Sequence, residues 1–137
     1  MTTGDSYSDP AAGTADAFVA FDSETGKLVW SRQMTAGDAF TVDCDFPDLR
    51  ANCPDANGPD FDFGSSPILI ELPNGRRALV AGQKSGMVHA VDPDKQAAVL
   101  WQTPHPGCRG IAGCSPAQSA AVTAIPGVVF SGGLDGI

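Results

Sequence analysis

A hairpin pattern that ends in tryptophan and then returns is the feature that most constrains the fold. Its first copy runs through Ala20-Phe21-Asp22, Ser23-Glu24-Thr25-Gly26-Lys27 and Leu28-Val29-Trp30. The apolar run at residues 17–21 predicts a strand, Gly26 can take the positive φ of a tight turn, and residues 28–30 predict the returning strand. The pattern therefore predicts an antiparallel hairpin.

The second copy of the pattern is preceded by one additional predicted strand. Residues 79–82 and 87–91 predict two strands around the turn Gln83-Lys84-Ser85-Gly86, and residues 99–101 predict a third. Ala90, Asp92 and Trp101 take the places of the alanine, aspartate and tryptophan of the first copy, although Asp92-Pro93 replaces the Thr-Gly turn.

A third copy begins at Val129, at an offset of 50 residues from Leu79, and residues 129–137 repeat residues 79–87. Four-stranded units that cannot bury their faces alone stack radially into β-propellers. We therefore expect an all-β fold with no helix beyond short turns, a single partial β-propeller domain over residues 1–137 with about two to three blades. A closed propeller needs at least four blades, so we expect a fragment. An antiparallel sandwich remains the alternative.

Each copy of the pattern places one tryptophan at the end of its hairpin. We expect Trp30 and Trp101 to be largely buried, each under its own blade, because both occupy the same repeat position.

An acidic insertion at about residues 34–63 separates the first two copies and is too rich in Asp, Pro and Gly to form a strand pair. It delivers Asp60-Phe61-Asp62-Phe63. In an extended backbone the two carboxylates share one face and the two rings the other. A general base or a hard-metal ligand needs an oxygen held in this way. An acidic turn without function is the alternative. A calcium loop at residues 55–62 is disfavoured, because Gly58 stands fourth where an EF-hand loop needs glycine sixth.

Charge and hydropathy exclude several classes of partner. Sixteen acidic residues against eight Lys and Arg give a net charge of −8, which argues against nucleic acid and anionic membranes. No stretch is long and apolar enough for a membrane-spanning helix, so we expect no membrane insertion. The N-terminal residues show no basic region followed by an apolar one, so no signal peptide is expected in this chain.

The four cysteines form two local pairs, Cys44 with Cys53 and Cys108 with Cys114. Loops this short favour disulfides within each pair, which suit an exported protein, while free thiols or a zinc site remain alternatives. No CxxCH haem motif is present. His89 alternates with apolar residues and is expected to be structural, and His105, between two prolines, to be solvated.

The motifs together resemble those of the pyrroloquinoline quinone (PQQ) dehydrogenases, the quinoprotein alcohol dehydrogenases. The hairpin pattern resembles their tryptophan-docking repeat, and residues 3–10, beginning Thr3-Gly4-Asp5, resemble the segment that binds calcium. Residues 60–63 resemble the segment of the catalytic base, and residues 83–86 the turn whose basic residue contacts the quinone. Residues 58–67, 80–87 and 114–136 are most similar to the branch that oxidises polyvinyl alcohol.

The resemblance implies a role for each site residue. Asp62 follows the aromatic Phe61 and takes the place of the catalytic base, beside the calcium ion. Asp5 would ligate Ca²⁺ and help to bind the cofactor, and Lys84 would donate to the quinone oxygens. Gly64 stands where lanthanide-using relatives carry an additional Asp, which favours calcium. We expect Asp5, Asp62 and Lys84 to converge at one end of the sheets, near the propeller axis.

The same resemblance implies a secondary or polymeric alcohol as substrate, cytochrome c as electron acceptor, and, with the cysteine pattern, a periplasmic location. The family's glutamate ligand, adjacent-cysteine disulfide and tryptophan floor have no counterpart here, so the chain alone should lack a complete cofactor site. Residues 102–116 are shorter than expected, as if a blade were missing there. The alternative function is a non-catalytic propeller scaffold or binding module with the same repeats.

Overall fold

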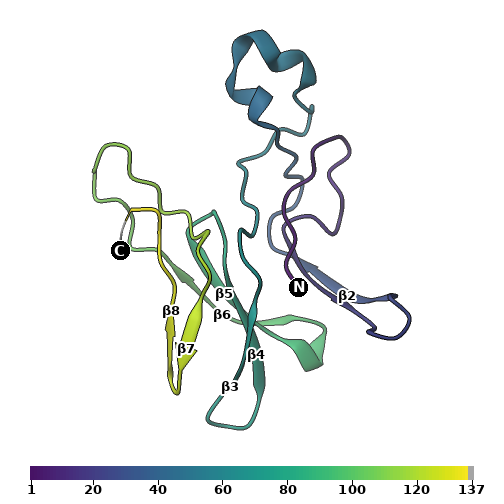
Figure 1. Cartoon of the computed structure of the whole chain (residues 1–137), viewed down its shortest axis with the longest axis vertical. Helices are drawn as coiled ribbons and strands as arrows, with labels where there is room; N and C mark the ends of the chain where they lie inside the picture. Colours follow the sequence, from purple (N-terminus) through teal and green to yellow (C-terminus); the bar gives the residue numbers. More distant parts are fainter. Residues whose placement is uncertain (136–137) are drawn as a thin grey trace.

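The structure is a computed structural model that describes residues 1–135. It is built from three antiparallel units joined by long loops: a β1–β2 hairpin, a four-stranded sheet in the order β3-β4-β5-β6, and a β7–β8 hairpin. Figure 1 shows the two hairpins on opposite sides of the four-stranded sheet. The all-β prediction is confirmed, since the helical turns among residues 1–135 are all short 3₁₀ segments.

The strands follow the predicted runs and extend them at most ends. Their bounds are β1 Ala17–Phe21, β2 Leu28–Gln33, β3 Ile68–Glu71, β4 Arg77–Gly82, β5 Met87–Asp92, β6 Ala98–Pro104, β7 Thr123–Ile125 and β8 Val128–Phe130. The third unit contains one strand more than predicted, because Pro126-Gly127, with Gly127 at φ 83°, turns β7 back into β8. The prediction for residues 136 and 137 lies outside the described residues.

The acidic insertion forms no strand pair, as predicted. It contains the 3₁₀ turns η1 (Val42–Asp45) and η2 (Pro47–Asn52), which lie at the top of Figure 1, and a third 3₁₀ turn, η3 (Pro93–Lys95), leads into β6. Both predicted disulfides are present: the Cα atoms are 5.0 Å apart for Cys44–Cys53 and 5.7 Å apart for Cys108–Cys114. These distances are typical of disulfides, and two disulfides are compatible with a location outside the cytoplasm.

The core has two apolar clusters. One joins Phe18 of β1 to Phe63, Ala81, Val91 and Ala97, and so connects the first hairpin to the four-stranded sheet through the end of the insertion. The other lies within the sheet, on Ala78, Val80, Val88 and Ala90. Because the first cluster includes Phe63, the segment that carries Asp60 and Asp62 is fixed at the junction of the two units.

Both tryptophans have most of their surface covered, as predicted, although neither is fully buried. Trp30 and Trp101 are each only partly buried, packed against the first and second cluster respectively. Both lie on the last strand of their unit. Trp101 also lines a groove that faces the β7–β8 hairpin.

The structure confirms the prediction for one histidine and contradicts the prediction for the other. His89 is buried between Gln83 and Gln102, with ring nitrogens 3.0 and 2.9 Å from their side chains, and burial lowers its pKa to about 4. It is structural, as predicted. The prediction that His105 is solvated is wrong: its Nε2 lies 3.2 Å from Asp135 Oδ2, and both side chains are nearly inaccessible. The segment after β8 returns over His105, which the flanking prolines could not indicate.

No helix of the described part of the chain has the length and hydropathy needed to cross a membrane.

Candidate functional site

Four charged side chains meet where the N-terminal segment, the insertion and the β4–β5 turn come together. Oxygen atoms of Asp5, Asp60 and Asp62 all lie within 4.8 Å of one another. Lys84 Nζ lies 2.8 Å from Asp60 Oδ1 and 3.2 Å from Asp62 Oδ1. The structure thus brings Asp5, Asp62 and Lys84 together, while their roles, and their place relative to a propeller axis, stay predictions.

Asp5 is placed by a segment that runs along the edge of β1. The Thr3 amide donates to Ala17 O, the Val19 amide to Met1 O and the Asp16 amide to Gly4 O, at 2.9–3.0 Å. This pairing carries the chain past the strand and leaves Asp5 at its end. Gly4 faces Asp62 closely, since a Cβ at this position would lie 3.5 Å from Asp62 Oδ2.

Lys84 is placed by the tight turn after β4. The Gly86 amide closes the turn on Gln83 O at 3.0 Å, and the Lys84 amide donates to Asp62 O at 3.0 Å. The backbone of Lys84 is therefore hydrogen-bonded to the backbone of Asp62. This bond fixes the position from which the lysine side chain reaches the carboxylates of Asp60 and Asp62.

Asp60 departs from the extended conformation expected for residues 60–63, since its φ is +60°. The reason is Asp38, whose buried carboxylate accepts the amides of Asp60 and Phe61 at 3.3 and 2.8 Å. Asp60 and Asp62 nevertheless both point to Lys84, while Phe63 is buried with its ring centroid 5.1 Å from that of Phe18. The predicted separation of acids from the anchoring ring of Phe63 is kept.

Burial raises the pKa of the Asp5 carboxyl, and the charges of Asp62 and Asp60 raise it further. Burial lowers the pKa of Lys84, but the contacts of its ammonium with the carboxylates of Asp60 and Asp62 outweigh burial, so the net direction is upward. Asp16, fully buried nearby, has its pKa raised to about 7 by burial and by the charge of Asp38. The site thus has more negative charge than Lys84 can neutralise.

The donor set fits a hard cation. Oδ2 of Asp5 and Oδ1 of Asp62 are buried without a hydrogen-bond partner, and the 3.2 Å approach of Lys84 to Asp62 is an ion pair without good hydrogen-bond alignment. Unpaired buried carboxylate oxygens are costly, and a Ca²⁺ ion that takes carboxylate oxygens would satisfy them. The cluster Cys108, Cys114 and Asp135 does not fit a metal, because its sulfurs form the disulfide.

At Gly64, expected to favour calcium, an added Cβ would lie 3.0 Å from the Cβ of Ser119. A larger side chain at this position would therefore need the neighbouring segment to shift.

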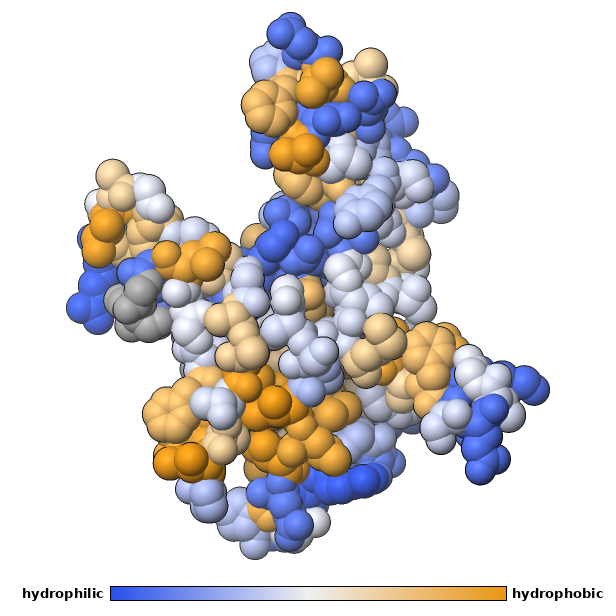
Figure 2. Space-filling model, viewed as in Figure 1, coloured by the Kyte–Doolittle hydropathy of each residue, from blue (hydrophilic) through white to orange (hydrophobic). Residues whose placement is uncertain are grey.

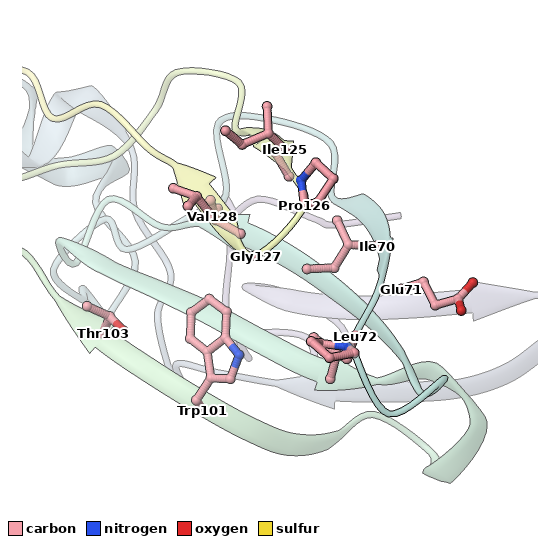
Figure 3. A pocket seen from close by; sticks show the side chains of 12 residues that line it. Ile70, Glu71, Leu72, Trp101, Thr103, Ile125, Pro126, Gly127 and Val128 are labelled. Atoms are coloured by element: carbon pink, nitrogen blue, oxygen red, sulfur yellow. The ribbon is translucent and has the colours of Figure 1, made fainter.

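A second, apolar region lies between the four-stranded sheet and the β7–β8 hairpin. It is a groove of about 690 Å³ lined among others by Ile70, Leu72, Trp101, Ile125 and Val128. Figure 3 shows the Trp101 ring facing the hairpin across this groove, and Figure 2 shows apolar surface gathered over the same part of the molecule. None of its lining residues belongs to the acidic site.

Sequence reasoning missed Asp16 and Asp38, which shape the site from beneath. A signal for Asp38 was present in Gly58, since a Cβ there would lie 2.2 Å from Asp38 Oδ1 and only glycine fits. That contact joins residues 20 positions apart in the insertion, which no local pattern could reveal.

Comparison with known proteins gives two similar curated sequences. The chain is 32% identical over 192 residues to a polyvinylalcohol dehydrogenase of Pseudomonas sp, covering 99% of this chain and 30% of that protein. It is 38% identical over 101 residues to a polyvinylalcohol dehydrogenase of Sphingopyxis sp. (strain 113P3), covering 73% of this chain and 15% of that protein. The predicted resemblance is confirmed. No family model and no solved structure matches the chain.

The chain therefore spans less than a third of the length of these relatives. The alignment with the Pseudomonas protein is 192 residues long, although this chain has 137, so that relative carries about 55 residues with no counterpart here. A propeller blade has about that size.

Proposed function

We propose that this chain is part of a PQQ- and calcium-dependent alcohol dehydrogenase of the polyvinyl alcohol dehydrogenase type, which oxidises a secondary or polymeric alcohol. The two similar dehydrogenases support an oxidoreductase. The observation that carries the proposal is the convergence of Asp5, Asp60, Asp62 and Lys84 from three separate segments. A propeller fold with cytochrome c as electron acceptor and a periplasmic location belong to the same proposal.

The residues divide the work by their chemistry. Asp5 and Asp62 offer the buried oxygens without hydrogen-bond partners that would hold Ca²⁺. Lys84 supplies a positive charge beside them, suited to oxygens of an anionic cofactor. When bound, PQQ with its calcium ion supplies the hydride acceptor for the alcohol carbon.

Asp62 would accept the proton of the alcohol hydroxyl at a carboxylate oxygen. A base is effective when its orientation is fixed, and the backbone of Asp62 is bound to Lys84 on one side and followed by the buried Phe63 on the other. Its Oδ1 accepts no hydrogen bond and is held only by the ion pair with Lys84, at 3.2 Å.

The test is reconstitution of the full-length protein carrying Asp62→Asn with PQQ and Ca²⁺, followed by dye-linked oxidation of secondary alcohols and polyvinyl alcohol. Removal of the base should lower kcat by roughly 10²-fold or more, while PQQ and Ca²⁺ affinity fall far less. Asp55→Asn, which removes an exposed carboxylate of the same insertion, is the matched control. Unchanged turnover in Asp62→Asn would leave Asp62 as a turn residue. Failure of wild type to bind PQQ would favour the non-catalytic scaffold.

A further inference from the structure

We propose that Asp60 is a positioning residue that takes the closer contact with the ammonium of Lys84 and so weakens the pairing of that ammonium with the Asp62 carboxylate. The inference rests on the proposed function, in which Asp62 is the base and Asp60 has no role. Asp60 Oδ1 receives the shorter and hydrogen-bonded contact from Lys84 Nζ, at 2.8 Å, and Asp62 Oδ1 the longer one, at 3.2 Å.

The backbone conformation of Asp60 is fixed by contacts with Asp38. An L residue at φ +60° costs about 1–2 kcal/mol, and the structure keeps it because Asp38 captures the two amides that follow the turn. Asp38 is itself buried and closely covered by Gly58. Two features of the sequence, a buried acid and a glycine with no room for a side chain, therefore serve to aim Asp60.

Lys84 needs a second acceptor because its backbone lies so close to Asp62. Its amide is bound to Asp62 O at 3.0 Å, so the flexible side chain starts within easy reach of the Asp62 carboxylate. Without Asp60 the ammonium would have Asp62 as its remaining ion-pair partner among the contacts of the described residues. It would then cover the oxygen that has to accept a proton or bind a cation.

Asp60 therefore acts through Lys84, which makes the proposal testable by a double-mutant cycle. The variants are Asp60→Asn, Lys84→Met and the double variant, with Asp55→Asn as the control. Asparagine matches aspartate in size and tolerates positive φ, so the backbone turn is retained. Methionine keeps the length of the lysine chain without its charge. Tb³⁺, a luminescent hard cation, reports directly on the Asp5 and Asp62 oxygens in the full chain.

With Lys84 present, Asp60→Asn should weaken Tb³⁺ binding by a factor roughly tenfold larger than in the Lys84→Met background, a coupling typical of residues in contact. Lys84→Met alone should tighten binding. Equal factors in the two backgrounds, within about twofold, would overturn the proposal, because Asp60 would then act only as a ligand. Asp55→Asn should change binding by less than twofold.

If wild type binds no Tb³⁺, the cation site of the proposed function fails, and the positioning role is then decided by urea unfolding in cation-free buffer. There the midpoint shifts of Asp60→Asn and Lys84→Met should be non-additive, because the variants remove the same ion pair. Additive shifts would overturn the proposal.

Discussion

The β1–β2 and β5–β6 hairpins carry the same sequence pattern, and they also share the same register. Ala20 pairs with Trp30 and Ala90 with Trp101, and in both hairpins the register shifts at the following residue of the first strand. The turns differ: Asp22 accepts the amides of Glu24 and Thr25, whereas Asp92 accepts the amide of Asp94 and pairs with Arg76. The paired alanine and tryptophan, rather than the turn, therefore define the repeat.

The hairpins differ in what lies on the other edge of their first strand. β5 has β4 there, whereas β1 has only the segment Met1–Thr3. The bridge Thr2–Phe18 corresponds to the pair Gly82–Val88, so the N-terminal segment replaces β4. Asp5 and Lys84 thus follow equivalent edges of two successive units. Equivalent ends of neighbouring units lie together, which explains how residues so distant in sequence meet.

A second difference between the two units lies two residues before Phe18 in the first and two residues before Val88 in the second. There β1 is preceded by Asp16 at φ 50° and β5 by Gly86 at φ 82°. Both units need a left-handed residue at this point, but only the first fills it with a buried carboxylate. Because both oxygens of that carboxylate are buried without hydrogen-bond partners, Asp16 should lower the stability of the first unit.

The largest expected effect separates the two equivalent core positions. Phe18→Ala should lower the free energy of unfolding by about 3–5 kcal/mol, because Phe18 is fully buried and contacts Phe63 across the junction. Val88→Ala should cost about 2 kcal/mol, since two methyl groups leave a smaller cavity. Urea unfolding followed by tryptophan fluorescence measures both. Equal costs would mean that the junction adds nothing to the first unit.

Asp16 and Gly86 occupy equivalent left-handed positions, and placing aspartate at the second position should lower stability. Gly86→Asp should destabilise by about 1–2 kcal/mol from positive φ and about 1–3 kcal/mol from overpacking. A Cβ at Gly86 would lie 3.1 Å from the Cβ of Pro116 and 3.2 Å from its carbonyl oxygen. Thermal unfolding of this variant beside Gly75→Asp, whose open turn has a similar φ of 76°, isolates the packing part. The same loss in both variants would leave only backbone strain.

The opposite exchange should stabilise. Asp16→Gly removes a buried carboxylate without hydrogen-bond partners and should gain roughly 1–3 kcal/mol at pH 8 in cation-free buffer. The pKa of Asp16 is raised from 3.8 to about 7, so the folded state holds a proton that the unfolded state loses. Stability from this group is fully present below about pH 4 and is lost as the pH rises through 7. The gain should therefore shrink from pH 8 to pH 4, and a gain independent of pH would contradict this origin.

The smallest effect concerns the turn of the first hairpin. Thr25→Ala removes the hydroxyl that donates to Asp22 Oδ1 at 2.6 Å. The bond is exposed, so the loss should be about 0.5 kcal/mol. A shift in the urea midpoint comparable to that of Val88→Ala would show that the turn, and not the alanine–tryptophan pair, defines this hairpin.

The local elements were predictable because each depends on neighbours in sequence. Alternating apolar residues around 79–91, the turn at Gln83–Gly86 and the two short cysteine loops predicted their strands, turn and disulfides. Pro126-Gly127 between two short apolar runs is also a turn signal of this local kind and is sufficient to indicate the β7–β8 hairpin. The burial of His105 could not be foreseen, since its partner Asp135 comes from the segment after β8.

The sequence by itself determined the strands of the repeated pattern, their antiparallel pairing, the equivalence of the alanine–tryptophan hairpins and the identity of Asp5, Asp62 and Lys84 as candidates. Periodicity, turn residues and short loop closure act over a few residues and leave a local record. Only the tertiary structure decided that Asp38 turns Asp60 to φ +60°, that Asp60 takes the ammonium of Lys84, and that Asp16 is buried beneath them. Those contacts join segments whose approach depends on the packing of Phe18 against Phe63, and packing between distant segments leaves no periodic trace in the sequence.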